Sequence, residues 1–163
     1  KHHVTGEVIP DSLLNKMILA RNFQSANDAL QQIFYGLLDL TLYDAYDLNA
    51  GLSTTEIVEK LQNEITLFPY FEGTHMQASF DHLLDYGASY YGYLWSEVFA
   101  ADMYSVFEKE GVLNQEVGLW FRKTILEKGG SENPMNLVRA FLRRDPNNEA
   151  FLKSQGISEY SEN

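Results

Sequence analysis

Cysteine is absent from this sequence of 163 residues. Without thiols the chain can form no disulfide, no thiolate metal site and no cysteine nucleophile, so nothing in it requires an oxidising compartment. No apolar run approaches the roughly 20 residues that a membrane-spanning helix needs. Residues 1–10 also lack the apolar core of a signal peptide. These absences predict a chain with no membrane partner and no thiol chemistry.

Positive charge is scarce as well. Lys and Arg number 12 against 23 Asp and Glu, which gives a net charge of −11 and an isoelectric point near 4.7. Phosphate backbones are bound by basic patches, so we expect no nucleic-acid partner. The negative charge fits a soluble, self-repelling surface, and attraction of cationic peptides is the alternative interpretation.

Sequence signatures of metal, nucleotide and serine-nucleophile sites are also missing. There is no H-E-x-x-H, which places two histidine ligands and a general base on one helix face, and no G-x-S-x-G. The stretch G-G-S at 129–131 lacks the lysine of a phosphate-binding loop and is interpreted as a turn. The first two histidines are adjacent near the N-terminus, while His75 and His82 lie seven residues apart. We therefore predict no metal ligands in this sequence.

Helical periodicity, by contrast, extends along nearly the whole chain. Apolar residues recur about every three or four positions, which is typical of helices packed on a core. The spacing predicts a single all-α unit without a separate domain or linker. The expected helices cover residues 13–18, 26–46, 54–65, 88–110 and 115–128, and two short helices open at 134 and 146. Residues 68–74 are expected to form a loop, with a short strand around residues 66–71 as an open alternative.

Capping residues mark where several of these helices begin. The stretch S-T-T-E at 53–56 is a capping box, in which the serine and glutamate side chains accept hydrogen bonds from each other's backbone amides. Asn114 is expected to cap the helix that follows it. Asn133-Pro134 and Asp145-Pro146 each place a capping side chain before a proline at the first helical position.

The stretch at 82–97 is the most informative one for function, because several tyrosines lie close together in it. If it is helical, Tyr90, Tyr93 and Glu97 share one face. Tyr86 would lie about one turn earlier, where a loop is expected. Tyrosine hydroxyls donate hydrogen bonds at neutral pH without carrying charge. A row of them aimed into a cleft can therefore hold peptide carbonyls or steady an oxyanion.

The same pattern fits an aromatic stripe that packs a core, and the pattern by itself favours that interpretation. Two details favour the interpretation that the tyrosines line a cleft. Gly87 and Gly92 flank the cluster, and glycine permits close backbone approach and unusual backbone angles. Tyrosines in place of phenylalanine or leucine also bring hydroxyls that each need a partner when buried. We therefore interpret the stretch as a substrate-facing surface.

At these residues the sequence resembles a known family. The pattern H-L-x-x-Y-x-A-x-Y-Y-G-Y-L-W-S-E-V at 82–98 is similar to the C-terminal signature of the thimet oligopeptidase and neurolysin family of zinc metallopeptidases. Further matches follow in the family's order along almost the whole chain, at Thr5-Gly6-Glu7, Pro10, Arg21, Gln32, Asp39, 110–114, Gly118, 125–126, 129–131, 141–142, 144–146, 150–152 and 156–157. So many ordered matches are more specific than any single one.

The resemblance implies an activity for the whole protein. Family members are mostly helical, enclose a deep channel that admits only short peptides, and hydrolyse internal peptide bonds with one zinc ion. Their zinc ligands, an H-E-x-x-H and a downstream glutamate, precede the region resembled here. The resemblance thus implies that residues 1–163 are the C-terminal segment of a zinc-metallopeptidase catalytic domain, a multi-helix piece that forms one wall of the channel.

Partners, cofactor and compartment follow from the same resemblance. The implied partners are short peptide substrates and the missing N-terminal part of the catalytic domain. The implied cofactor is zinc in the full-length enzyme, with none bound by this segment alone. The implied compartment is the cytoplasm, with the mitochondrion as the alternative.

The resemblance also implies site residues. His82 matches the histidine of the family's glycine-rich loop, and Tyr86, Tyr90 and Tyr93 match its substrate-contacting tyrosines. We expect His82, Tyr90 and Tyr93 to be catalytic, with Tyr90 or Tyr93 joining His82 in hydrogen bonding to the developing oxyanion. Tyr86 and Gly87 are expected to bind the substrate backbone.

Two other accounts of the chain stay open. One is a non-catalytic helical module that binds peptides and has lost the metal half. The other is one chain of a split enzyme whose second chain supplies the zinc site. A large exposed apolar face on this chain would favour an account in which a part is missing. The isolated chain is expected to be inactive as a peptidase, because no base or metal site is visible in it.

The isolated chain should bind no equimolar zinc, because it contains neither H-E-x-x-H nor cysteine. Metal analysis after dialysis from a zinc-containing buffer checks this. Tight binding of one ion per chain that is lost in His75→Ala or His82→Ala, but kept in His2→Ala, would contradict the prediction.

Overall fold

The computed structural model describes residues 1–44, 49 and 51–157, and this part of the chain consists of helices and irregular segments with no strand. The helices are α1 (Asp11–Arg21), α2 (Ser25–Tyr43), α3 (Thr54–Ile65), α4 (His82–Asp85), α5 (Gly92–Glu110), α6 (Gln115–Phe121), α7 (Pro134–Leu142) and α8 (Glu149–Ser154). A 3-10 turn spans Met76–Ser79, and a π-helical turn at Arg122–Leu126 follows α6. The predicted all-α fold is confirmed, and residues 66–71 are irregular.

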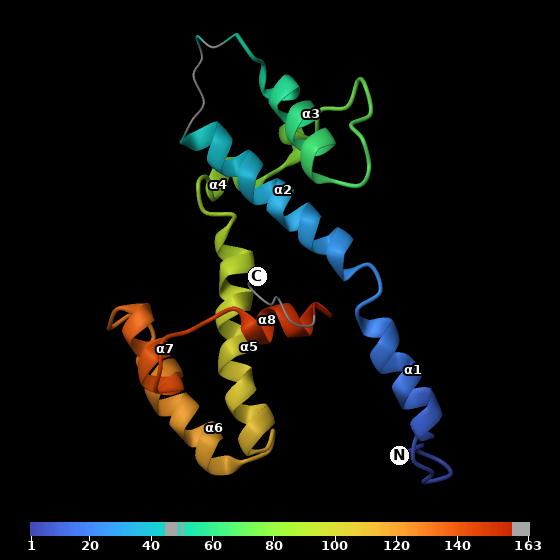
Figure 1. The fold of residues 1–163 in the computed structure, drawn as a ribbon. Helices are drawn as coiled ribbons and strands as arrows, with labels where there is room; N and C mark the ends of the chain where they lie inside the picture. The colour runs from blue at the N-terminus through green and yellow to red at the C-terminus, as the bar shows by residue number, and fades with distance from the viewer. Residues whose placement is uncertain (45–48, 50, 158–163) are drawn as a thin grey trace, which may run out of the picture.

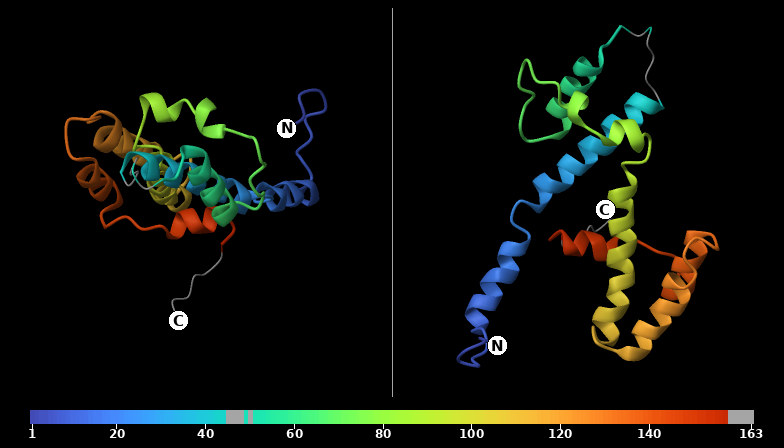
Figure 2. Two further views of the ribbon diagram at one scale, coloured as in Figure 1. Left: turned by 90° about the horizontal axis from the view of Figure 1, so that it is seen from above. Right: turned by 180° about the vertical axis from the view of Figure 1, so that it is seen from behind.

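Two groups of helices lie on either side of the segment that joins α4 to α5 (Figure 1). In the first group α2 packs along α3, with α4 near the C-terminal half of α2. In the second group α5 is flanked by α6 and α7 and crossed by α8. The view from behind shows α1 extending away from both groups (Figure 2). None of the described helices is both long and apolar enough to cross a bilayer.

Each group has its own small apolar core. Phe34 and Leu38 of α2 share a helix face because they are four residues apart, and this face packs on Ile57 and Val58 of α3. The second core joins α5, α6 and α7, and its buried members are Val117, Val138, Phe141 and Leu142. The two clusters are separate, so contacts other than these cores must fix one group against the other.

Most predicted helix starts are confirmed. The Ser53 hydroxyl accepts from Glu56 N at 3.2 Å and the Glu56 carboxylate accepts from Ser53 N at 2.6 Å, which completes the capping box. The Asn114 and Asn133 side chains accept hydrogen bonds from amides in the first turns of α6 and α7. These starts were readable from sequence because the cap and its partner lie within one turn.

The prediction that Asp145-Pro146 opens the last helix is wrong. α8 begins at Glu149, whose amide donates to Asn147 Oδ1 at 3.0 Å. The Asp145 carboxylate instead accepts from Arg139 Nε at 2.6 Å. A capping side chain engaged by a distant arginine is not available to its own helix.

The helix expected from residue 88 begins at Gly92. Ala88 has φ of 58°, in the left-handed region and therefore incompatible with a right-handed helix. The amides of Ala88 and Tyr90 donate to Asp39 rather than within a helix. The end predicted for the 26–46 helix, at Tyr46, lies outside the described residues.

α1 has no buried residue, although its sequence is largely apolar. Leu13, Leu14, Met17 and Ile18 are between 40% and 56% exposed. These four side chains, at spacings that share one side of a helix, leave an exposed apolar surface along α1.

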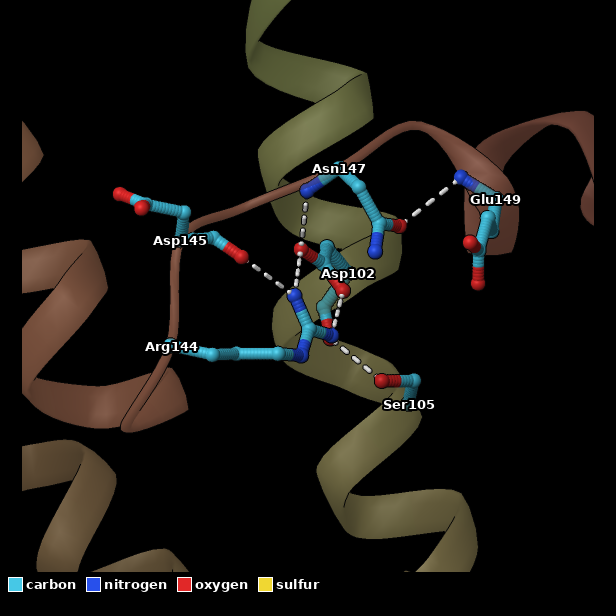
Figure 3. Close-up of polar contacts among 6 residues, drawn as sticks. All are labelled: Asp102, Ser105, Arg144, Asp145, Asn147 and Glu149. Atoms are coloured by element: carbon cyan, nitrogen blue, oxygen red, sulfur yellow. Dashed lines mark hydrogen bonds and ion pairs between the residues drawn. The ribbon is translucent and has the colours of Figure 1, made fainter.

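An ion pair ties α5 to the segment before α8 (Figure 3). Asp102 is 1% exposed, and its carboxylate accepts from the Arg144 guanidinium through both oxygens and from Asn147 N at 2.9 Å. Burial by itself raises the pKa of Asp102, but the hydrogen bonds from Arg144 and Asn147 outweigh it and hold the pKa below the usual aspartate value.

Asp102→Asn should lower the free energy of unfolding by roughly 1–3 kcal/mol near neutral pH, because charged hydrogen bonds are lost. The pKa of Asp102 is lower in the folded than in the unfolded chain. Its stabilising effect is therefore complete above about pH 5 and fades as the pH falls through the unfolded-state value and then the lowered folded-state value. Urea unfolding at about pH 7 and about pH 3 should show a smaller gap between parent and variant at the acidic pH. An equal gap at both would contradict this.

Candidate functional site

Four aromatic side chains predicted to form the site come together where α4 leads into α5. The His82 ring centroid lies 5.0 Å from that of Tyr90, 5.6 Å from that of Tyr93 and 6.4 Å from that of Tyr86. The Tyr90 and Tyr93 centroids are 5.0 Å apart. Most of these pairs meet edge to face, an arrangement that aromatic rings prefer. We call His82, Tyr86, Tyr90 and Tyr93 the aromatic cluster.

Two hydroxyls of the aromatic cluster have partners within the chain. His82 Nε2 and Tyr93 Oη are 3.1 Å apart, within hydrogen-bond distance. Tyr90 Oη donates to Gln32 Oε1 of α2 at 3.2 Å. When Nε2 carries the proton, it donates to Tyr93 Oη, and the hydroxyl hydrogen of Tyr93 is then free to donate elsewhere. The pair can therefore present one hydroxyl hydrogen to a bound group.

Exposure divides the aromatic cluster. Tyr90 is 8% exposed, whereas Tyr86 and Tyr93 are each 48% exposed. Burial raises the pKa of Tyr90, with the hydrogen bond to Gln32 acting in the opposite direction, so its hydroxyl stays protonated at neutral pH. The Tyr90 ring also packs edge-on against Tyr35 at 5.5 Å. The core interpretation therefore describes Tyr90, while Tyr86 and Tyr93 are open to solvent.

His82, Tyr90 and Tyr93 line a cavity of about 620 Å³ at the surface of α2 and α5. This volume is in the range of small-ligand sites. The remaining lining residues are Ser25, Asp28, Ala29, Gln32, Leu94, Glu97 and Gln155. Tyr86 and Gly87 are not among them, although the Tyr86 ring lies 5.9 Å from that of Tyr93. The lining contains two acidic residues, Asp28 and Glu97, and no Lys or Arg.

The tyrosine pattern does not predict the α2 side of this cavity. Small and polar residues recur on α2 at spacings of three or four, at Ser25, Asp28, Gln32, Gly36 and Asp39. They share one face because such spacings return to the same side of a helix. Phe34 and Leu38 lie on another face, packed in the apolar core. A polar stripe along an otherwise apolar helix is the signal that identifies this wall.

The α2 helix also fixes the backbone of residues 86–91. Asp39 is 0% exposed, and its two carboxylate oxygens accept from Ala88 N and Tyr90 N, each at 2.9 Å. The backbone of Tyr91 also lies close to α2, since a Cβ at Gly36 would stand 3.5 Å from Tyr91 Cα, an ordinary van der Waals contact. The segment just before α5 is thus held against α2 by hydrogen bonds from its backbone amides to Asp39.

The two glycines that flank the tyrosines have different surroundings. A Cβ at Gly87 would lie 2.5 Å from the Tyr43 ring. That ring belongs to a side chain that is 52% exposed, and its hydroxyl donates to Leu83 O. A Cβ at Gly92 would meet nothing within 4 Å. The predicted close approach is therefore found at Gly87 and not at Gly92.

The histidines do not gather into a metal site. His75 Nδ1 lies 3.2 Å from the Thr55 hydroxyl, and His82 pairs with Tyr93. Across residues 1–44, 49 and 51–157, no group of three or more His, Asp or Glu side chains is placed to hold a metal ion.

Comparison with known proteins places this geometry in context. The model of the family described as "Peptidase family M3" matches residues 1–157. Oligopeptidase A of Salmonella typhimurium is 39% identical over 158 residues, and the oligopeptidase A of Escherichia coli is 38% identical over the same length; each match covers 96% of this chain and 23% of the relative. Saccharolysin of Saccharomyces cerevisiae is 37% identical over 160 residues, 96% of this chain and 22% of that protein. The chain thus spans about a quarter of the length of these curated relatives.

Gly87→Ala should lower the free energy of unfolding by about 1 kcal/mol, because the added methyl group overlaps the Tyr43 ring, whose half-exposed side chain has to shift. Gly92→Ala is the matched control and should be neutral or stabilising by up to about 1 kcal/mol, since alanine is the better helix former. Chemical denaturation of the two variants measures the difference. Equal stability of the two would show that Tyr43 yields to the methyl group.

Proposed function

The chain belongs to peptidase family M3, and we propose that it is part of a zinc metalloendopeptidase, an oligopeptidase that hydrolyses internal bonds of short peptides. The observation that carries the role of this segment is the cavity on which His82, Tyr90 and Tyr93 converge. Uncharged hydroxyl donors beside an imidazole suit a peptide carbonyl, which becomes negatively charged on oxygen during hydrolysis.

Within that enzyme, residues 1–163 form the C-terminal segment of the catalytic domain and one wall of the substrate channel. The exposed apolar surface of α1 supports this arrangement, because it provides a face on which the N-terminal part of the domain packs. The length of the relatives, of which this chain spans about a quarter, also supports it. A cytoplasmic location, or alternatively a mitochondrial one, is proposed from the family resemblance alone.

Tyr93 is the proposed principal donor to the oxyanion. It is half-exposed and lines the cavity. When His82 Nε2 is protonated, it donates a hydrogen bond to the Tyr93 hydroxyl oxygen. The Tyr93 hydrogen then points to whichever acceptor the substrate presents. Tyr90 is a weaker candidate, because its hydroxyl already donates to Gln32 and must give up that bond to reach the substrate.

Tyr86 and Gly87 are proposed to bind the substrate backbone. The Tyr86 ring stands beside Tyr93 at the edge of the cavity and is 48% exposed. Its hydroxyl can hold a peptide group in both the ground state and the transition state. Gly87 follows Tyr86 directly in the chain and is half-buried, with the Tyr43 ring against one side of its Cα.

Zinc does not fit the residues described here, since they contain no ligand set for it. In the complete enzyme the ion supplies Lewis-acid chemistry, and its ligands are proposed to lie in the N-terminal part. The contribution of this segment is therefore confined to hydrogen bonding and substrate placement. By itself the segment is expected to show no peptidase activity on a quenched-fluorescent peptide.

The apolar surface of α1 equally favours a split enzyme, in which a second chain covers it. A non-catalytic peptide-binding module would retain the cavity but have no use for a hydroxyl that stabilises developing charge. Kinetics of tyrosine variants in the full-length protein separate that module from the enzyme.

Tyr93→Phe in the full-length enzyme should lower kcat by roughly 10²- to 10³-fold with little change in KM, because the bond strengthens only as charge develops. Tyr86→Phe should mainly raise KM, since its hydroxyl holds the substrate throughout the reaction. Tyr90→Phe should show the smaller loss in kcat together with about 1 kcal/mol of lost stability from its bond to Gln32.

Tyr91→Phe is the matched control, because this tyrosine is 51% exposed and lies outside the cavity lining. Steady-state kinetics and melting temperatures are measured for all four variants. If none of the three cluster variants lowers kcat/KM by more than about threefold relative to Tyr91→Phe, the aromatic cluster only packs and the proposed function of this segment is wrong.

A further inference from the structure

We propose that Asp39 is a positioning residue of this site: its buried carboxylate holds the backbone of residues 88–90 so that Tyr90 and Tyr93 face the cavity. This inference rests on the function proposed above. It assigns to a residue on α2, which touches no substrate, control over the placement of the tyrosine hydroxyls.

The hydrogen bonds of the Asp39 carboxylate all go to the backbone of residues 88–90. It is 0% exposed, so it contacts neither solvent nor the cavity, and it is not among the cavity-lining residues. Both oxygens are engaged by backbone amides, Ala88 N through Oδ1 and Tyr90 N through Oδ2. No Lys or Arg among the described residues pairs with it. A buried carboxylate is costly unless its hydrogen bonds are made, so this one is tied to the two amides.

The segment that Asp39 holds has little local stabilisation of its own. Ala88 has φ of 58°, which disfavours any residue with a side chain. α5 begins at Gly92 without a side-chain cap from its own sequence. The negative charge of Asp39 instead lies just before the positive end of that helix, where it is stabilising. The strained turn and the start of α5 therefore both depend on a residue from α2.

The same segment carries Tyr90 of the aromatic cluster and leads directly into Tyr93. Tyr90 is bound through its own amide, and its ring contacts both His82 and Tyr93 at 5.0 Å between centroids. Tyr93 lies one turn further along, in the first turn of α5. A shift of the backbone at Tyr90 is therefore passed to both hydroxyls and to His82. Misplacement of a reacting group by about 1 Å can cost 10²-fold in rate.

Asp39→Asn tests the carboxylate with almost no change in volume. An amide can accept only one of the two N–H groups, and its own NH₂ then faces the other donor. In the full-length enzyme we expect kcat/KM to fall by roughly 10- to 100-fold, mostly in kcat. Hydrogen exchange of the peptide covering residues 86–93 should accelerate at the same time.

Asp102→Asn is the matched control. Asp102 is buried to 1% exposure and likewise accepts a backbone amide from an irregular segment, that of Asn147. It lies nine residues beyond Tyr93 on α5, roughly 13 Å along the helix axis. Its substitution should accelerate exchange near residues 144–149 and lower the melting temperature, yet change kcat/KM by less than about threefold well below that temperature.

The double variant Asp39→Asn/Tyr93→Phe distinguishes positioning from general destabilisation, because it measures whether the two losses in kcat are independent. If Asp39 acts through Tyr93, the losses in kcat should combine to much less than their product, because an absent hydroxyl cannot be misplaced. Full multiplication of the two losses, or a kcat for Asp39→Asn no lower than for Asp102→Asn, overturns the inference. If the Tyr86→Phe, Tyr90→Phe and Tyr93→Phe variants leave kcat/KM unchanged, the proposed function is overturned, and the inference about Asp39 is overturned with it.

Discussion

Asp39 carries a carboxylate without solvent contact, and both of its oxygens accept backbone amides from the segment between α4 and α5. The two apolar cores of the chain are separate, one on α2 and α3 and the other among α5, α6 and α7. The relative placement of the two groups therefore depends on contacts across the junction. Asp39, the Tyr90–Gln32 hydrogen bond and the Ser25–Gln155 hydrogen bond provide such contacts, all from one face of α2.

The same device recurs at Asp102, which fixes the segment before α8 through Arg144 and the Asn147 amide. Helices satisfy their own backbone groups, whereas irregular segments near the interior must find partners elsewhere. A carboxylate that accepts two or three N–H groups meets this need in a small volume. The two buried aspartates, Asp39 and Asp102, thus each fix an irregular segment, and one of these segments carries the proposed site.

The tyrosine-rich stretch combines two roles that sequence reasoning treats as alternatives. Tyr90 is buried and joins Tyr35 and Phe80 in edge-to-face packing. Tyr93 and Tyr86 are half-exposed, and only Tyr93 of these two lines the cavity. Packing one tyrosine gives the next a rigid base, since the position of Tyr93 depends on a neighbour that cannot move freely. In the proposed site, the packing of Tyr90 is therefore a requirement for the placement of the Tyr93 hydroxyl.

The sequence by itself determined the all-α fold, most helix starts and the cluster of His82, Tyr86, Tyr90 and Tyr93, because periodicity, caps and the family pattern are local signals. It misplaced the starts of α5 and α8, where Ala88 and Asn147 give their amides to aspartates roughly 50 and 45 residues away in sequence. Only the tertiary structure decided which tyrosine is buried, that Gln32 and Asp28 share the cavity, and that Asp39 fixes the turn. The physical reason is that hydrogen bonds to a buried carboxylate depend on proximity in space, whereas helical periodicity reports only the spacing of residues along the chain.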